Sequence, residues 1–286
     1  MRVGVRSRRS RAWSDGLAYG GLVPFLVFAL FPFYFMFVTS FKRNAELYDL
    51  KSVPFWIQTG AIVDHYTYLF GRTDFFTWMK NSLIISVVAT SASLVISVLA
   101  GYSLARLRYR GVGSFGTAVF VTYLVPPTLL FLPLSQVVVW LGISDTIWAL
   151  IVTYPTFLVP FCTWLLMGYF RTVPREVEEC ALVDGASRMQ TLLRIVLPMA
   201  VPGIVCAALF SFTLCWNEFI YALTFVSQSG NKTAVVGVTA DLIRGDIYYW
   251  GSLMAGAVLA SVPIACIYVF FLDYYVSGLT AGAVKG

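Results

Sequence analysis

Most of the residues able to do chemistry lie in one polar stretch of the chain, residues 172–198. Carboxylates, arginines and small residues stand close together there. Carboxylates form strong charge-assisted hydrogen bonds with basic groups, and small side chains allow another backbone to approach closely. The stretch is therefore a candidate for charge-mediated docking of a partner, although composition alone favours an ordinary interfacial helix. The acidic and small residues of this surface are Glu178, Glu179, Cys180, Ala181, Asp184, Gly185 and Ala186.

The local signals within this stretch predict two short helices joined by a sharp turn. Pro174 suits the first position of a helix, and Gly185 suits the left-handed residue that ends it. Ser187 followed by Gln190 has the spacing of a capping box, which starts a second helix. Pro198 is expected to end that helix. The second helix has an apolar set that we expect to pack on neighbouring helices: Met189, Leu192, Leu193, Val196 and Leu197.

A second group of polar residues, Asn217 and Glu218, lies within an apolar run beside Trp216. An ionised group at the centre of a membrane costs about 2.5–3.5 kcal/mol on insertion scales, so such residues face protein or water. The three residues are therefore candidates for lining a polar path through the membrane. Hydrogen bonds to a neighbouring helix are an equally weighted structural alternative.

The remaining candidates for chemistry predict no catalytic site, metal site or cofactor. His65 is the single histidine, and a surface position is expected for it. The five cysteines include no CxxC pair, and most lie in apolar runs, as small apolar filling residues do. No lysine follows a glycine directly, so the chain has no P-loop for ATP.

The elements that position these residues are membrane helices. The sequence is 59% hydrophobic and 12% charged, whereas a soluble domain carries about 25% charged residues. A run of about 20 apolar residues is enough for a helix to cross the hydrocarbon core. Six runs qualify: 16–38, 81–104, 114–141, 146–170, 199–225 and 251–276.

Two features refine this picture. Prolines at 126, 127 and 133, and again at 155 and 160, should kink or break the third and fourth spans. The basic residues cluster in the N-terminus, in residues 106–110 and in residues 171–194. The positive-inside rule then places both termini and the 171–198 loop in the cytoplasm. The net charge of +6 is thus a topology signal rather than a nucleic-acid surface.

The 171–198 loop resembles the signature of ABC importer permeases. That signature reads E-A-A, then three residues, G, nine residues, I, one residue and L-P. The matching residues here are Glu179-Cys180-Ala181, Gly185, Ile195 and Leu197-Pro198, with every spacing kept. Cys180 is the one departure, a small residue in place of the first alanine. The Trp216–Phe219 stretch is similar to one common in sugar-importer permeases, and residues 276–286 resemble the end of the maltose-importer permease without its large periplasmic insert.

The resemblance, which runs from about Tyr19 to the end, implies a fold and a set of partners. The fold would be an all-α integral membrane protein with six transmembrane helices, the type I ABC importer permease fold with a cytoplasmic coupling-helix loop. The partners would be a dimer of ABC ATPases, a second permease subunit and a periplasmic or lipoprotein substrate-binding protein, within bacterial inner-membrane lipid. The chain itself would not be an enzyme, because ATP hydrolysis would lie on the ATPase.

The same resemblance implies how the chain is organised and what it carries. Residues 1–74 would hold the basic N-terminus, the first span and a periplasmic loop. Residues 75–276 would form the transmembrane core, and residues 277–286 a cytoplasmic tail. The cargo would be a carbohydrate or polyol. In such permeases the motif glutamate, here Glu179, faces an arginine-bearing surface of the ATPase.

Two other classes of membrane protein, an ion-coupled secondary transporter and a membrane enzyme, are alternatives to an ABC importer permease. An ion-coupled secondary transporter would explain broken helices and Glu218. It also predicts inverted repeats and several intramembrane acids, and the sequence shows neither. A membrane enzyme would require a cluster of ionisable groups near one face, and His65 has no evident partner set. Neither class explains the loop that contains Glu179.

Overall fold

The computed structural model describes residues 8–244 and 247–281. Within these residues the regular secondary structure is helical apart from one short antiparallel pair, β1 (Ile243–Arg244) and β2 (Ile247–Tyr248). By its internal contacts the chain divides into two units, residues 1–72 with 242–259 and residues 73–241 with 260–286. The basic residues Arg2 and Arg6 of the expected cytoplasmic N-terminus lie outside the described residues.

The first unit is built on α1 (Arg8–Ser40), which is apolar enough to cross a membrane from Tyr19 to Ser40. Two short helices follow, α2 (Asn44–Leu47) and α3 (Asp64–Arg72). The start of α14 (Trp250–Phe270) completes the unit. The exposed surface of α1 is largely apolar, as expected for a helix whose surroundings are lipid or other apolar helices.

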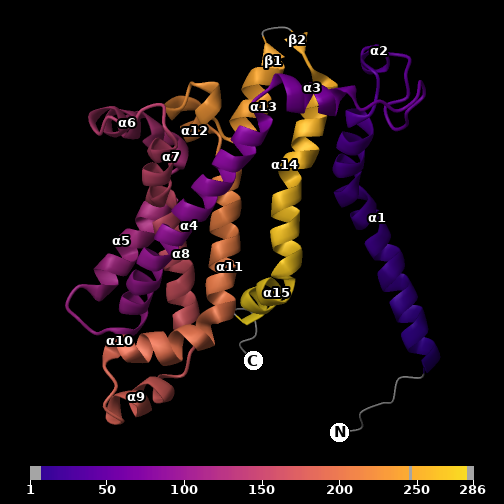
Figure 1. Ribbon diagram of the computed structural model, residues 1–286. Coiled ribbons are helices and arrows are strands. Elements are labelled where there is room, and N and C mark those ends of the chain that lie inside the picture. The colour runs from indigo at the N-terminus through magenta and orange to yellow at the C-terminus, as the bar shows by residue number, and fades with distance from the viewer. Residues whose placement is uncertain (1–7, 245–246, 282–286) are drawn as a thin grey trace. The chain divides into compact units, whose positions relative to one another are not determined.

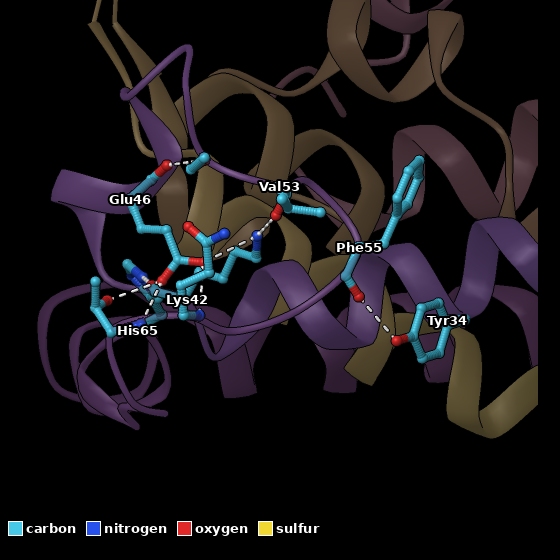
Figure 2. Close-up of polar contacts among 9 residues, drawn as sticks. Tyr34, Lys42, Glu46, Val53, Phe55 and His65 are labelled. Atoms are coloured by element: carbon cyan, nitrogen blue, oxygen red, sulfur yellow. Dashed lines mark hydrogen bonds and ion pairs between the residues drawn. The ribbon is translucent and has the colours of Figure 1, made fainter.

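A buried ion pair holds the loop that follows α2. Lys42 Nζ lies 3.1 Å from Glu46 Oε1, and both side chains are almost fully buried. Lys42 also donates to the carbonyl of Val53 at 2.7 Å, and Glu46 accepts the backbone N–H groups of Gln58 and Thr59, both at 3.1 Å. Figure 2 shows Lys42 reaching between Glu46 and Val53. Residues 42–59 are thereby closed into an ordered loop, and we call the contacts of Lys42 and Glu46 that close it the clasp.

The same contacts set the ionisation of Glu46. Burial alone raises the pKa of this carboxyl group, because the charged form loses its water. Hydrogen bonds from the Thr59 hydroxyl, at 2.8 Å, and from the backbone and Lys42 act in the opposite direction and prevail. The net result lowers the pKa of Glu46 to about 2.

His65 is not the surface residue expected from the sequence. Only 5% of it is exposed, and its Nε2 lies 2.8 Å from the carbonyl oxygen of Lys42, next to the clasp in Figure 2. The ring packs so closely on Gly251 that a Cβ there would lie 2.1 Å from Nε2. The surrounding residues are polar, which made the segment look exposed, but tertiary contacts bury this one side chain.

The second unit contains the remaining helices. They are α4 (Phe75–Arg106), α5 (Val112–Leu124), α6 (Pro127–Trp140), α7 (Ile147–Thr153), α8 (Pro155–Phe170), α9 (Arg175–Val183), α10 (Arg188–Thr191), α11 (Leu197–Trp216), α12 (Ile220–Phe225), α13 (Ala234–Leu242) and α15 (Leu272–Ala281), with a π-helical turn at Leu192–Val196 and a 3₁₀ turn at Ser229–Asn231. In Figure 1, α9 and α10 lie at one end of this unit, and α6, α7 and α12 gather at the other.

The membrane spans agree with the sequence in number and differ at several ends. Among the described residues, five helices are long and apolar enough to cross a membrane, and the pair α5 and α6 makes a sixth if it counts as one span. That pair is bent by 95°, at Pro126 and Pro127, as the prolines predicted. The predicted 199–225 span is displaced toward the N-terminus, because α11 ends at Trp216 and its helix begins as early as Arg188. The last predicted span also breaks: α14 ends at Phe270 and α15 runs through the predicted tail as far as Ala281.

Packing in the second unit centres on α4 and α8. Gly101 on α4 allows close approach, because a Cβ at this position would lie 3.2–3.3 Å from atoms of Thr163, Leu166 and Met167 on α8. One apolar cluster, around Tyr154, fills the end of the unit near α7 and α12. Another, around Phe170, fills the end near α9. Leu192 and Val196 of the 171–198 loop belong to the second cluster, which therefore anchors the loop to the membrane helices.

Candidate functional site

The first helix of the polar loop, α9, ends as its sequence predicted. Gly185 has a φ of +86°, the left-handed conformation that glycine adopts without steric cost. The N–H of Ala186 donates to the carbonyl of Ala181 at 3.0 Å, and the N–H of Gly185 to that of Leu182 at 3.2 Å. These two bonds form a Schellman motif, which satisfies the last carbonyls of the helix. Pro174 occupies the N-cap position, one residue before the first helical position that was predicted for it.

The second helix, α10, begins with the predicted capping box. Gln190 N donates to the Ser187 side chain at 3.3 Å, and Ser187 N donates to the Gln190 side chain at 2.7 Å. Two backbone donors at the helix start are thereby satisfied. The turn between α9 and α10 is fixed from both sides, by the Schellman motif and by this box.

The end predicted for the second helix is wrong. Pro198 does not stop it, because α10 passes through the π-helical turn at Leu192–Val196 directly into α11, in which Pro198 occupies the first turn. Residues 188–216 therefore form one continuous helical span. A proline removes one helical hydrogen bond and crowds the carbonyl four residues earlier. The wider π turn just before Pro198 accommodates both effects.

The two neighbouring acids of the loop have opposite environments. Glu178 is 6% exposed, with Oε1 2.9 Å from Arg106 Nε and Oε2 accepting from the Tyr102 hydroxyl at 3.3 Å. Glu179 is exposed. Of the predicted docking residues, Glu178 and Ala181 thus face the interior of this chain.

The α10 side of the turn is exposed at Ser187, Arg188, Met189 and Gln190, and the α9 side carries a second exposed surface. Its members around the turn are Glu179, Cys180, Val183, Asp184 and Gly185, and Ala186 is half-buried. Side chains here are small or acidic, except for Val183, which is 86% exposed. The arrangement presents a protruding backbone turn with carboxylates on its flanks, a shape suited to a cleft with basic walls.

The apolar set of the second helix divides between two faces. Leu192 and Val196 are buried and pack into the cluster around Phe170, as predicted. Met189 and Leu193 are 53% and 54% exposed, so they remain available at the surface. Of the motif positions that follow, Ile195 and Leu197 are half-buried and Pro198 is exposed.

A pocket of about 290 Å³ opens between the loop and the end of α4. Four arginines and two glutamates line it, together with Leu182. The charged lining residues are Arg106, Arg108, Arg175, Arg188, Glu178 and Glu179. Sequence spacing does not reveal this pocket, because its walls come from segments about 70 residues apart.

The second candidate group lies at the break between α11 and α12. Glu218 accepts the N–H groups of Tyr221 and Ala222, at 2.8 and 3.0 Å, and the hydroxyl of the buried Tyr154 at 3.0 Å. The Trp216 indole donates to the carbonyl of Ala260 at 3.1 Å. Both side chains therefore serve the local structure.

Asn217, between them, is exposed, and its amide donates to the Thr213 carbonyl at 2.9 Å. Of the three residues, Asn217 has the most exposed side chain, since Trp216 is buried and Glu218 is half-buried. A place on the translocation pathway stays a prediction for all three residues. Within the described part of the chain, no group of His, Cys, Asp or Glu could hold a metal ion.

Comparison with known proteins decides the family. Residues 93–280 match the family model described as "Binding-protein-dependent transport system inner membrane component". This permease belongs to that family. It is 36% identical over 270 residues to the inner membrane ABC transporter permease protein YcjP of Escherichia coli, an alignment that covers 94% of this chain and 95% of the relative. It is 32% identical to the diacetylchitobiose uptake system permease protein DasC of Streptomyces coelicolor, with 98% and 99% covered.

Solved structures support the fold of the permease. A chain of a bacterial ABC transporter involved in the import of the acidic polysaccharide alginate superposes with a TM-score of 0.76. The alignment covers 96% of the permease and 100% of that chain, at 21% identity. The type I ABC importer permease fold is thereby confirmed, with its membrane helices. Members of this family are transport components, and the ion-coupled alternative is not favoured.

Proposed function

We propose that the permease forms part of the translocation pathway for a carbohydrate or polyol and couples to a separate ATPase through the Glu179–Pro198 loop. The observation that carries the proposal is the exposed acidic turn at Glu179–Gly185, built by a Schellman motif and a capping box at the family spacing. A protruding turn that is fixed on both sides can be bound by a partner protein and moved as one body. The ATP hydrolysis that drives it would take place on the partner.

The proposed assembly follows the family pattern. A dimer of ATPases binds the cytoplasmic loop, a sister permease completes the pathway, and a substrate-binding protein delivers cargo on the opposite side. Both termini lie in the cytoplasm. Residues 1–74 form the N-terminal segment, residues 75–276 the core and residues 277–286 the tail. The cluster of arginines beside the loop supports this orientation, by the positive-inside rule.

The carbohydrate class rests on relatives that are named for the uptake of sugars and are more than 30% identical to this chain. A thermal-shift screen of the partner binding protein tests it. We expect stabilisation by oligosaccharides or polyols. Stabilisation by amino acids or peptides alone would remove the carbohydrate assignment and leave the ABC assignment in place.

Coupling is tested with Glu179→Lys and Gly185→Val in the complex reconstituted into proteoliposomes. Lysine at 179 reverses the charge offered to the ATPase, and valine at 185 strains the left-handed turn. We expect uptake to fall while ATP hydrolysis continues or the ATPase dissociates. Gly185→Asn is the matched control, because asparagine tolerates the left-handed region. Normal uptake by assembled Glu179→Lys and Gly185→Val complexes would refute the coupling role.

A further inference from the structure

The loop is fastened to the membrane helices at one buried polar junction. Arg106 is the last residue of α4, and its Nε lies 2.9 Å from Glu178 Oε1 on α9. Both side chains are at most 8% exposed. A second guanidinium nitrogen of Arg106 donates to the carbonyl of Val173, just before α9. One arginine therefore holds both the helix and the segment leading into it.

The α4 side of this junction is closely packed. Tyr102, one turn before Arg106, donates to the second oxygen of Glu178 at 3.3 Å. Its ring meets that of Phe170 edge to face, with centroids 6.0 Å apart. Gly101 brings the backbone of α4 against α8 at the same level. Close-packed interfaces do not deform continuously, and these contacts connect α9 to α4 and α8 together.

The other end of the loop has a different attachment. Beyond Gly185 the capping box starts α10, and the helix continues without a break into α11. The loop therefore has a covalent helical connection to α11, a short covalent link to α8 through residues 171–174, and a side-chain connection to α4. Only the side-chain connection can be removed without changing the chain path.

We infer that Arg106 and Glu178 are positioning residues that transmit movement of α9 to α4 and α8 during transport. The inference rests on the proposed function, since it assumes that an ATPase moves α9. Glu178 is buried toward its own chain and takes no part in ATPase docking. Glu179, its exposed neighbour, does. The two acids of the motif region thus have separate roles.

A purely structural role is the competing explanation, because buried ion pairs also fix local geometry. The two explanations differ in what they predict for assembled complexes. A structural role predicts loss of assembly or thermal stability, with transport per ATP unchanged in the complexes that remain. A transmitting role predicts intact assembly, continued ATP hydrolysis and less transport per ATP.

The test uses the full complex in proteoliposomes, with uptake and ATP hydrolysis measured in the same sample. Glu178→Gln keeps the size of the side chain and removes its charge, and Arg106→Gln removes the other partner. Glu176→Gln is the matched control, because Glu176 lies exposed on the same helix. Co-purification of the ATPase and the melting temperature of each complex are recorded, since they report docking and stability separately.

We expect Glu178→Gln and Arg106→Gln to retain the ATPase and to lower uptake per ATP about tenfold, within the usual range of coupling between sites. The charge-exchanged double variant, Arg106→Glu with Glu178→Arg, should recover part of the ratio, and a double-mutant cycle measures that recovery. Unchanged uptake per ATP in the assembled single variants would overturn the inference. Loss of assembly in every variant would also overturn it, because the pair would then serve folding alone. Loss of ATPase binding in Glu179→Lys bears only on the proposed function.

Discussion

Glu178 and Glu179 are adjacent in the sequence, yet their carboxylates belong to different environments. Glu178 is 6% exposed and lies 2.9 Å from the guanidinium of Arg106, whereas Glu179 is exposed at the surface of α9. Consecutive residues on a helix are separated by about 100° around its axis, so neighbours can face the protein and its surroundings respectively. The helix thereby joins an inner attachment to an outer contact surface within one turn.

Labelling of Cys180 tests the orientation of the loop. Cys180 is exposed, whereas Cys162, Cys206 and Cys215 are buried. In vesicles prepared without the ATPase, we expect a membrane-impermeant maleimide to label Cys180 when they are inside-out, and we expect no labelling in intact spheroplasts, because the proposed topology places the loop in the cytoplasm. Mass spectrometry of the labelled peptide provides the measurement.

Cys180→Ala serves as the control for this experiment, and it restores the alanine of the family signature. It should abolish labelling of the peptide and preserve transport. Labelling of Cys180 in intact spheroplasts would reverse the proposed topology.

Removal of the capping box should loosen α10. In Ser187→Ala the N–H of Gln190 loses its side-chain acceptor, at a cost of about 1 kcal/mol. We expect faster amide hydrogen exchange in residues 188–191, by roughly fivefold, since 1 kcal/mol changes a local opening equilibrium by about that factor. Ser187→Asp keeps an acceptor at the same position and should retain the protection. Equal exchange in wild type and Ser187→Ala would show that the box does not stabilise the helix.

The clasp around Glu46 should depend on pH in the acidic range. Its pKa is lowered from 4.5 to about 2 in the folded protein. The carboxylate therefore contributes stability that is fully present above about pH 4.5 and is lost as the pH falls toward 2. We expect the amides of Gln58 and Thr59 to keep their protection factors at pH 7 and to lose them between pH 4.5 and 2.

Glu46→Gln is the control for this pH dependence, since the amide side chain does not titrate. It should show lower protection at pH 7 and little change down to pH 3. A wild-type profile that matches the Glu46→Gln profile would exclude Glu46 as the titrating group.

Gly237 should not tolerate a side chain. A Cβ at this position would lie 2.2 Å from Cδ2 of Trp78, a fully buried ring whose indole N–H donates to the Ser229 carbonyl at 2.8 Å. Overpacking of this kind costs about 1–3 kcal/mol, so we expect Gly237→Ala to lower the melting temperature in detergent. Gly168→Ala, where no atom lies within 4 Å of the added carbon, should leave it unchanged or raise it. An unchanged melting temperature in Gly237→Ala would mean that α13 shifts freely against α4.

The sequence predicts those features of the loop that depend only on residues a few positions apart, namely the helix caps and the turn. Gly185, Ser187 and Gln190 form the turn that their types and spacing indicated, because caps involve residues only a few positions apart. The breaks at Pro126 and Pro127 are local in the same sense. The i, i+4 spacing of Lys42 and Glu46 is a signal that could have indicated their pairing in advance.

Long-range contacts were not accessible to that reasoning. Arg106 and Glu178 are far apart in the sequence, and nothing near either residue indicates the other. The burial of His65 is likewise decided by Lys42 and Gly251, which are distant in the chain. The predicted end of the second helix is wrong for another reason: proline usually breaks a helix, but the π turn before Pro198 accommodates it.

The continuous helix from α10 into α11 gives the spacing of the family signature a mechanical meaning. No irregular segment separates the start of α10 from the membrane span. The number of residues between Gly185 and Pro198 therefore fixes how α11 is rotated about its axis relative to α9. One inserted residue would rotate the face of α11 by about 100° and advance it by about 1.5 Å. The spacing of the signature therefore sets the orientation of α11 relative to the turn at Gly185. Insertions or deletions in this segment should be far less tolerated than changes of residue type.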